Sequence, residues 1–188
     1  MSAIVYKITL LGEGAVGKTA LRDRFMGKPF SADYHMTIGA DIAFKTKYYG
    51  DKEVKFQIWD LAGQPRFELV QPPYYRGSLG SLIVFDLTRP ESLERVLNWV
   101  DKLWKLSGKG KIPVVLLGNK ADLRNAPSVT TLSPEQGQAV AEKLSEISRH
   151  WGFEVPYLET SAKMGRNVED AFDLLATNIS QFIQLQLE

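Results

Sequence analysis

The order of apolar and polar residues along the chain alternates between strand-like and helix-like patterns. Residues 4–11 form a β-rich apolar stretch, and residues 19–25 suit a helix that Gly27 can terminate. Two alternating runs follow, one at Ile42, Phe44, Thr46 and Tyr48 and the other at Val54, Phe56 and Ile58. The turn-forming residues 49–52 between them predict a hairpin, which we expect to be the one antiparallel pair.

The second half of the chain continues the alternation. Continuous apolar runs at residues 82–85 and 112–117 are typical of strands covered on both faces, and residues 153–158 predict a last strand. One helix is predicted to open at residues 90–92, and residues 133–136 combine an N-cap, a first-turn proline and a capping box. Apolar stripes at helical spacing run through Val96, Leu97, Val100, Leu103 and Trp104 and through Val168, Phe172, Leu175, Ile179 and Phe182.

Six predicted strands interleave with about five predicted helices. This order predicts an α/β fold with a doubly wound, mainly parallel six-stranded sheet, one antiparallel edge strand and helices on both faces. In such sheets ligands bind beyond the carboxyl ends of the strands, and the polar motifs below each follow a strand. A chain of 188 residues is expected to form a single domain spanning residues 1–188.

The loop after the first strand carries a phosphate-binding pattern. Residues 12–19 read GEGAVGKT, which matches G-x-x-x-x-G-K-[ST]. The glycines let the backbone curl so that successive N–H groups converge on an anion, and the following helix adds its positive N-terminal end. The expected phosphate contacts are Gly14, Ala15, Val16, Gly17, Lys18 and Thr19, with the Lys18 ammonium at the β- and γ-phosphates and the Thr19 hydroxyl on Mg²⁺. A glycine-rich turn with a surface lysine is the alternative; the strand before and the helix after favour the phosphate loop.

A second motif follows the predicted strand at residues 54–58. Residues 57–66 read QIWDLAGQPR, which places Asp60 at the end of a strand, where its carboxylate can hold Mg²⁺ through water. Gly63 can offer its backbone N–H to the γ-phosphate, and the Gln64 amide can orient a water molecule for in-line attack. The D-x-x-G pattern alone is weak evidence for a nucleotide site, but its position after a phosphate loop in the sequence makes the evidence stronger.

Two further loops predict recognition of guanine. Asp122, in the NKAD run at residues 119–122, can accept bonds from guanine N1–H and the 2-amino group, neither of which adenine presents. Lys120 can lie along the purine, and Asn119 can brace the loops. In the SAK run of Ser161, Ala162 and Lys163, the N–H of Ala162 can donate to guanine O6. A solvated polar loop is the alternative to each run taken alone.

Composition excludes several classes of function. The net charge of +1 gives no bulk attraction to nucleic acid, and the chain has no cysteine for disulfides, thiolate chemistry or prenylation. The longest apolar runs are strand-sized, and the N-terminal stretch leads into the phosphate loop rather than a cleavage site. We expect a soluble cytoplasmic monomer without a lipid anchor in this chain, peripheral to membranes only through partners or a C-terminal tail.

The motifs together resemble those of the Ras-superfamily small GTPases, and within them the Rab proteins. The Rab-like signals are TIGAD at residues 37–41, FQIWD at 56–60, YYRGS at 74–78 and ETSAK at 159–163. The resemblance covers residues 4–182 and implies the P-loop fold of small G proteins. It also implies that Thr37 binds Mg²⁺ and the γ-phosphate, that Phe30 packs against guanine, and that Tyr34 covers the phosphates.

Three features depart from the Rab pattern. The chain has no C-terminal cysteine, and Pro65 stands where a glutamate usually follows the glutamine. Pro65 restricts Gln64 to extended backbone and is expected to shift intrinsic hydrolysis. Pro72 and Pro73 are expected to end any short helix by Gln71. Neutral drift in a loop is the alternative for both proline positions.

The leading functional hypothesis is a switch that binds GTP or GDP with Mg²⁺ and hydrolyses GTP slowly, with Gln64, Lys18 and Thr37 in catalytic roles. Residues 30–38 hold no arginine to act in cis, so an activating protein is expected to supply one. Effectors and an exchange factor are the other expected partners. The candidate apolar effector contacts are Ile42, Phe44, Trp59, Phe67 and Tyr75. The alternatives are a nucleotide-gated scaffold with negligible hydrolysis and a P-loop ATPase or small-molecule kinase, which the guanine motifs disfavour.

Overall fold

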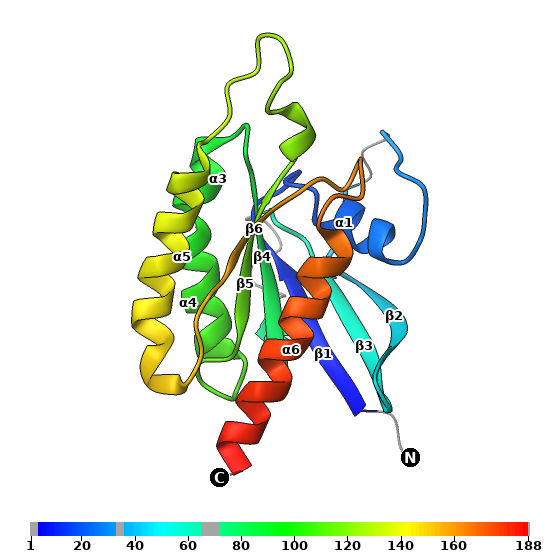
Figure 1. Ribbon diagram of the computed structural model, residues 1–188, viewed down its shortest axis with the longest axis vertical. Coiled ribbons are helices and arrows are strands. Elements are labelled where there is room, and N and C mark those ends of the chain that lie inside the picture. The colour runs from blue at the N-terminus through cyan, green and yellow to red at the C-terminus, as the bar shows by residue number, and fades with distance from the viewer. Residues whose placement is uncertain (1–3, 33–35, 65–71, 188) are drawn as a thin grey trace.

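A six-stranded sheet with strand order β2-β3-β1-β4-β5-β6 forms the centre of the molecule (Figure 1). The structure is a computed structural model and describes residues 4–32, 36–64 and 72–187. The strands are β1 Ile4–Leu11, β2 Ala40–Tyr49, β3 Lys52–Leu61, β4 Gly80–Asp86, β5 Val114–Asn119 and β6 Tyr157–Thr160. Only the edge pair β2–β3 is antiparallel among the described strands; the other four pairs are parallel. The predicted α/β architecture and the hairpin at residues 49–52 are therefore confirmed.

Helices cover both faces of the sheet and enclose a core on each (Figure 1). The α-helices are α1 Lys18–Phe25, α2 Pro72–Tyr75, α3 Pro90–Glu94, α4 Val96–Leu106, α5 Pro134–Ser148 and α6 Val168–Leu187, with short 3₁₀ turns at Ala121–Leu123 and Arg149–Trp151. α1 and α6 pack on one face, and α3, α4 and α5 pack on the other. β4 and β5 are buried along their whole length, as their continuous apolar runs predict.

Three phenylalanines fix α1 and α6 to the sheet. The rings of Phe25 and Phe172 stack with centroids 3.7 Å apart and an interplanar angle of 2°, and Phe56 meets both edge-on. All three side chains are fully buried. Because α1 directly follows the loop at residues 12–17, this cluster holds that loop against the sheet.

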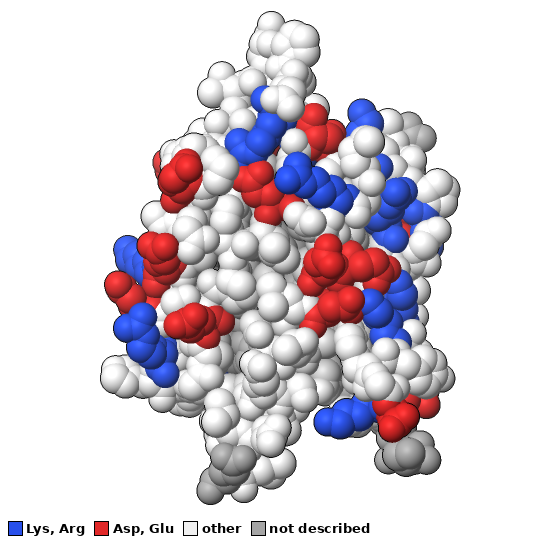
Figure 2. Space-filling model, viewed as in Figure 1, with Lys and Arg blue, Asp and Glu red and all other residues white. Residues whose placement is uncertain are grey.

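Ion pairs connect the edge strand β2 to α6. Lys47 Nζ lies 2.8 Å from Glu169 Oε2 and 2.5 Å from Asp173 Oδ1, and Lys45 Nζ lies 2.7 Å from Glu169 Oε1. The Tyr49 hydroxyl also donates to Asp173, at 2.5 Å. Figure 2 shows the acidic side chains over α6 beside the lysines of the strand.

Three boundaries differ from the sequence expectations. The helix expected from residue 90 is divided at Arg95 into α3 and α4, although the N–H of Trp99 still donates to the Arg95 carbonyl at 3.2 Å. β5 starts at Val114, after Pro113, rather than at residue 112. The last strand starts at Tyr157 rather than at residue 153, because hydroxyls of α5 hold the preceding backbone: Ser148 Oγ donates to Phe153 O, and Ser145 Oγ accepts from the N–H of Val155.

Pro72 and Pro73 open the short helix α2, which the sequence patterns did not predict. The expected end of a helix by Gln71 lies outside the described residues. A proline fits the first turn because the N–H it lacks has no partner there. Within residues 4–32, 36–64 and 72–187, no helix is long and apolar enough to cross a membrane.

The stacked phenylalanines provide a test of the fold. Phe172→Ala is expected to lower the free energy of unfolding by about 3–5 kcal/mol, because it removes a fully buried ring and leaves a cavity. The control Phe44→Ala truncates a ring that is 50% exposed and is expected to cost less than about 1 kcal/mol. Urea unfolding followed by circular dichroism measures both, and equal losses would contradict this account of the core.

Candidate nucleotide-binding site

A cavity of about 770 Å³ lies at the carboxyl ends of the strands. Its walls come from the loop after β1, the start of α1, residues within 29–32 and 36–41, the loop after β3 and the loop after β5. Ten of the predicted site residues line it: Gly14, Ala15, Gly17, Lys18, Thr19, Phe30, Thr37, Gly63, Gln64 and Lys120. Motifs far apart in the sequence therefore surround one hollow.

The loop after β1 has the backbone that an anion cradle requires. Gly12 has φ +139° and Gly17 φ +101°, and a Cβ on them would lie 2.0 Å from Val84 O and 2.2 Å from Asn119 Nδ2 respectively. Among the described residues, no hydrogen bond uses the N–H of Ala15, Val16 or Gly17. Val16 is fully buried and does not line the cavity, unlike Ala15 and Gly17. Backbone N–H groups without an internal partner can donate to the oxygens of an anion.

Lys18 lies buried under the same loop. Its Nζ donates to the carbonyls of Gly12 and Glu13, at 2.8 Å each. Burial lowers the pKa of Lys18 to about 8, and the nearby carboxylates of Asp60 and Glu13 oppose this shift. The Lys18 ammonium is thus held against the backbone of the loop after β1, where the phosphates are expected.

Oxygen atoms of three predicted metal-binding residues converge at the start of α1. Thr19 Oγ1 donates to Asp60 Oδ2 at 2.5 Å and lies 3.0 Å from Thr37 Oγ1. Asp60 is fully buried, its Oδ1 has no hydrogen-bond partner within the described part of the chain, and burial raises the pKa of its carboxyl. Hydroxyl and carboxylate oxygens are the ligands that Mg²⁺ prefers. No group of three or more His, Asp or Glu that could hold a metal occurs among the described residues.

Gly63 and Gln64 approach the loop from the end of β3. A Cβ on Gly63 would lie 2.3 Å from Gly12 O and 2.5 Å from Glu13 O, so only glycine fits there. The Gln64 side chain reaches the other flank of the loop, where its Cγ would lie 3.3 Å from a Cβ on Gly14. Gln64 is therefore positioned beside the cradle.

Asn119 joins the phosphate loop to the predicted base-binding loops. Its Nδ2 donates to Val16 O at 2.9 Å, and its Oδ1 accepts from the Ala162 N–H at 3.3 Å. Asp122 Oδ1 accepts from the Ser161 hydroxyl at 2.6 Å, and the same hydroxyl accepts from the N–H of Met164. Asn119, Asp122, Ser161 and Ala162 thus form one network, although none of the four lines the cavity. Lys163 is exposed beside them.

The structure adds residues to the site that sequence reasoning missed. Asp86 Oδ2 lies 2.5 Å from Lys120 Nζ, and Arg22 pairs with Asp41 at 2.5 Å while lying 3.6 Å from Asp60. A sequence signal existed for Asp86, because it ends a buried strand as Asp60 does. No motif marks the two contacts at the back of the loop, from Arg89 Nη1 to Gly14 O at 2.8 Å and from Trp99 Nε1 to Glu13 Oε1 at 3.1 Å.

One expected surface residue is wrong, and three further residues with an expected role lie outside the described residues. Tyr75 is fully buried and belongs to the core under α4, so it cannot contact an effector. Its neighbour Tyr74 instead packs against Trp59, with ring centroids 5.7 Å apart. Tyr34, Pro65 and Phe67 are the three that fall outside the described ranges.

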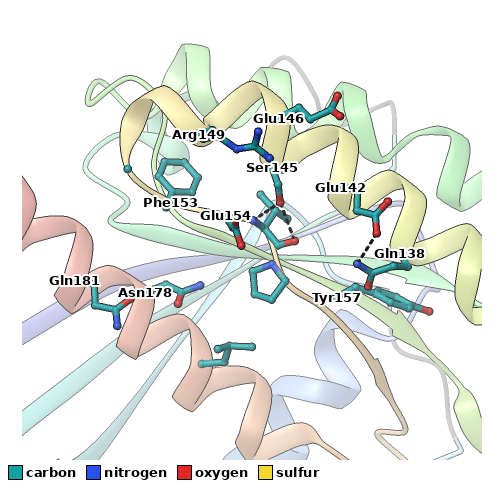
Figure 3. A pocket seen from close by; sticks show the side chains of 14 residues that line it. Gln138, Glu142, Ser145, Glu146, Arg149, Phe153, Glu154, Tyr157, Asn178 and Gln181 are labelled. Atoms are coloured by element: carbon teal, nitrogen blue, oxygen red, sulfur yellow. Dashed lines mark hydrogen bonds between the residues drawn. The ribbon is translucent and has the colours of Figure 1, made fainter.

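A second hollow, of about 870 Å³, opens between α5, α6 and residues 152–157 (Figure 3). Its labelled lining includes Glu142, Glu146, Arg149 and Glu154, and the Glu142 carboxylate accepts a hydrogen bond from Gln138 (Figure 3). It carries none of the predicted phosphate- or base-binding motifs. The smaller cavity at the strand ends is therefore the better candidate site.

Comparison with known proteins agrees with this geometry. The model of the Ras family matches residues 7–181. Ras-related protein RabC of Dictyostelium discoideum is 41% identical over 94% of this chain and 84% of its own length. Ras-related protein RABA4b of Arabidopsis thaliana is 38% identical over 93% and 72%, and Ras-related protein Rab-8A of Gallus gallus is 36% identical over 98% and 83%. The chain thus belongs to the Ras family and is a Rab-like small GTPase.

Proposed function

We propose that this small GTPase is a guanine-nucleotide-dependent switch that binds GTP and GDP with Mg²⁺ and hydrolyses GTP slowly. The observation that carries the proposal is the meeting of Thr19, Thr37 and Asp60. These residues come from α1, from the loop before β2 and from the end of β3, and Thr19 Oγ1 lies 2.5 Å from Asp60 Oδ2 and 3.0 Å from Thr37 Oγ1. A ligand bound by these three side chains would connect the loop before β2 and the end of β3 to the phosphate loop.

Mg²⁺ fits this group of oxygens. Thr19 and Thr37 would bind it directly, and Asp60 would bind it through water, with its unpaired Oδ1 supplying an acceptor. When bound, Mg²⁺ neutralises charge on the β- and γ-phosphate oxygens. The buried ammonium of Lys18 acts on the same charge from the other side of the cradle.

Gln64 is the residue placed to orient the attacking water. Its amide offers both a donor and an acceptor beside Gly14, where the γ-phosphate would end. Gly63 lies against the backbone of Gly12 and Glu13, and its N–H would donate to the γ-phosphate. Catalysis then consists of positioning and electrostatic stabilisation, with little covalent work for the protein.

Asp122 is the residue proposed to select guanine. Ser161 uses one lone pair of Oδ1, which leaves the other acceptor positions of the carboxylate for guanine N1–H and the 2-amino group. The Ala162 N–H already donates to Asn119 at 3.3 Å, so a bond to guanine O6 would be shared with Asn119 or replace it. Lys120, which is paired with Asp86, and Phe30 both line the cavity, and the purine would pack against them.

The GTP and GDP states would differ in the two loops that reach the γ-phosphate. With GTP bound, Thr37 and Gly63 hold it and fix residues 36–40 and 61–64; after hydrolysis those contacts are lost. Effectors would read the adjoining apolar surface of Ile42, Phe44, Trp59 and Tyr74, and Ile38, which is 73% exposed, extends it. An exchange factor and an activating protein would set the rates.

Base selection can be tested at Asp122. Asp122→Asn is expected to weaken GDP binding at least about 100-fold and to strengthen binding of xanthosine diphosphate, because an amide N–H then faces the base where a carboxylate oxygen accepted. Isothermal titration with both nucleotides measures the change. Asp101→Asn, on the exposed face of α4, is the control that should bind GDP as the wild type does. Unchanged GDP affinity in Asp122→Asn would refute the assignment.

Hydrolysis can be tested at Gln64. Gln64→Leu is expected to slow single-turnover GTP hydrolysis about 10- to 100-fold while GTP affinity stays within about threefold, because the amide acts on water rather than on the nucleotide. Gln181→Leu, on the exposed side of α6, is the matched control. If the wild type itself shows no hydrolysis above the Gln64→Leu rate, the chain is a nucleotide-gated scaffold instead.

A further inference from the structure

Arg89 contacts the phosphate loop from outside the cavity. It precedes α3, and its guanidinium Nη1 donates to the carbonyl of Gly14 at 2.8 Å across 75 positions of sequence. Its Nε donates to Glu91 Oε1 at 2.9 Å, so the guanidinium is held at both ends. Arg89 does not line the cavity, and no predicted motif includes it. Its contact with Gly14 therefore needs an explanation of its own.

The geometry of the peptide bond makes this contact relevant to phosphate. In a trans peptide the carbonyl of one residue and the N–H of the next point in opposite directions in one plane. A donor that fixes the Gly14 carbonyl therefore also fixes the Ala15 N–H, aimed away from Arg89. Ala15 lines the cavity, and its N–H has no other partner among the described residues. A charge-assisted bond to the carbonyl also polarises the peptide and strengthens that N–H as a donor.

The backbone at Ala15 shows why a tether is required. Ala15 has φ +63°, a left-handed conformation that is unfavourable for a residue with a Cβ. Such a conformation persists only where surrounding contacts over-determine it. Glu13, which precedes Gly14, is also contacted from behind the loop, because the buried Trp99 donates to its carboxylate at 3.1 Å. Arg89 and Trp99 thus contact two consecutive residues, Arg89 at the backbone carbonyl of Gly14 and Trp99 at the side chain of Glu13.

We propose that Arg89 is a positioning residue that holds the Gly14–Ala15 peptide so that the Ala15 N–H meets the β-phosphate end of a bound guanine nucleotide. The proposal rests on the proposed function. It implies a dependence on phosphate number: Arg89 supports the affinity for nucleotides with a second phosphate and contributes nothing to GMP, which ends before that N–H. A general loosening of the fold would weaken both.

The experiment compares GDP and GMP on four proteins. Dissociation constants are measured by calorimetry, and GDP release is measured with a fluorescent GDP in the presence of Mg²⁺. Arg89→Ala is expected to release GDP about tenfold faster and to bind it about tenfold more weakly, with GMP binding unchanged, because one charge-assisted hydrogen bond is lost. Arg89→Lys, which keeps a charged donor, is expected to recover part of the loss. Arg95→Ala, an exposed arginine at the end of α3, is the matched control and should behave as the wild type.

The outcomes separate this proposal from the proposed function. GDP behaviour equal to the wild type in Arg89→Ala, or equal weakening of GDP and GMP, overturns the positioning role while leaving the switch intact. A loss of GTP hydrolysis above about 100-fold with GDP release unchanged also overturns it, because the guanidinium would then act on the reacting phosphate directly. If the wild type binds neither nucleotide, the proposed function fails first. Should Arg89→Ala not fold, Glu91→Gln, which removes the charge that holds Arg89, is expected to shift GDP release in the same direction by a smaller factor.

Discussion

The side-chain amide of Asn119 is the interaction on which the arrangement of the site depends. It is almost fully buried at the end of β5, where it holds Val16 O with one end and Thr160 Oγ1 and the Ala162 N–H with the other. The loop after β1 and the loop after β6 therefore meet across one residue. A buried amide that is hydrogen-bonded at both its nitrogen and its oxygen favours a single geometry, and here that geometry sets the spacing between the loop after β1 and the loop after β6.

Glycine at two positions allows neighbouring segments to pack this closely against the loop after β1. A Cβ on Gly17 would lie 2.2 Å from Asn119 Nδ2, and one on Gly63 would lie within 2.5 Å of the backbone of residues 12 and 13. Close packing of backbone against amide and of backbone against backbone leaves no room for a side chain at either place. The spacing of glycines that the phosphate-loop pattern requires therefore reflects packing between loops as well as the path of one loop.

Much of this architecture could be predicted from the sequence because local patterns determine it. Buried runs such as residues 82–85 and the capping box at Ser133 gave the elements, and residues after strand ends gave the site. The boundary of β6 could not be predicted, because hydroxyls of Ser145 and Ser148 hold the backbone before Tyr157. Tyr75 was misplaced because its neighbour Tyr74 is identical in type, and periodicity in a four-residue helix does not say which ring faces inward. Arg89 was missed because its partner lies 75 positions away and is a backbone carbonyl, which leaves no signal in residue type.

The lysines that tie β2 to α6 have a consequence for the behaviour of the protein in solution. Side chains of a strand alternate between its two faces. Lys45, Lys47 and Tyr49 contact Glu169 and Asp173 on one face of β2, so the even-numbered residues of β2 lie on the opposite, outward face. Ile42, Phe44 and Tyr48 are accordingly 41%, 50% and 70% exposed, on the outermost strand of the sheet. An apolar strip on an unpaired edge favours self-association. The strip overlaps the surface proposed to bind effectors, so the isolated protein would self-associate through that surface. A bound effector would cover the strip and block this self-association.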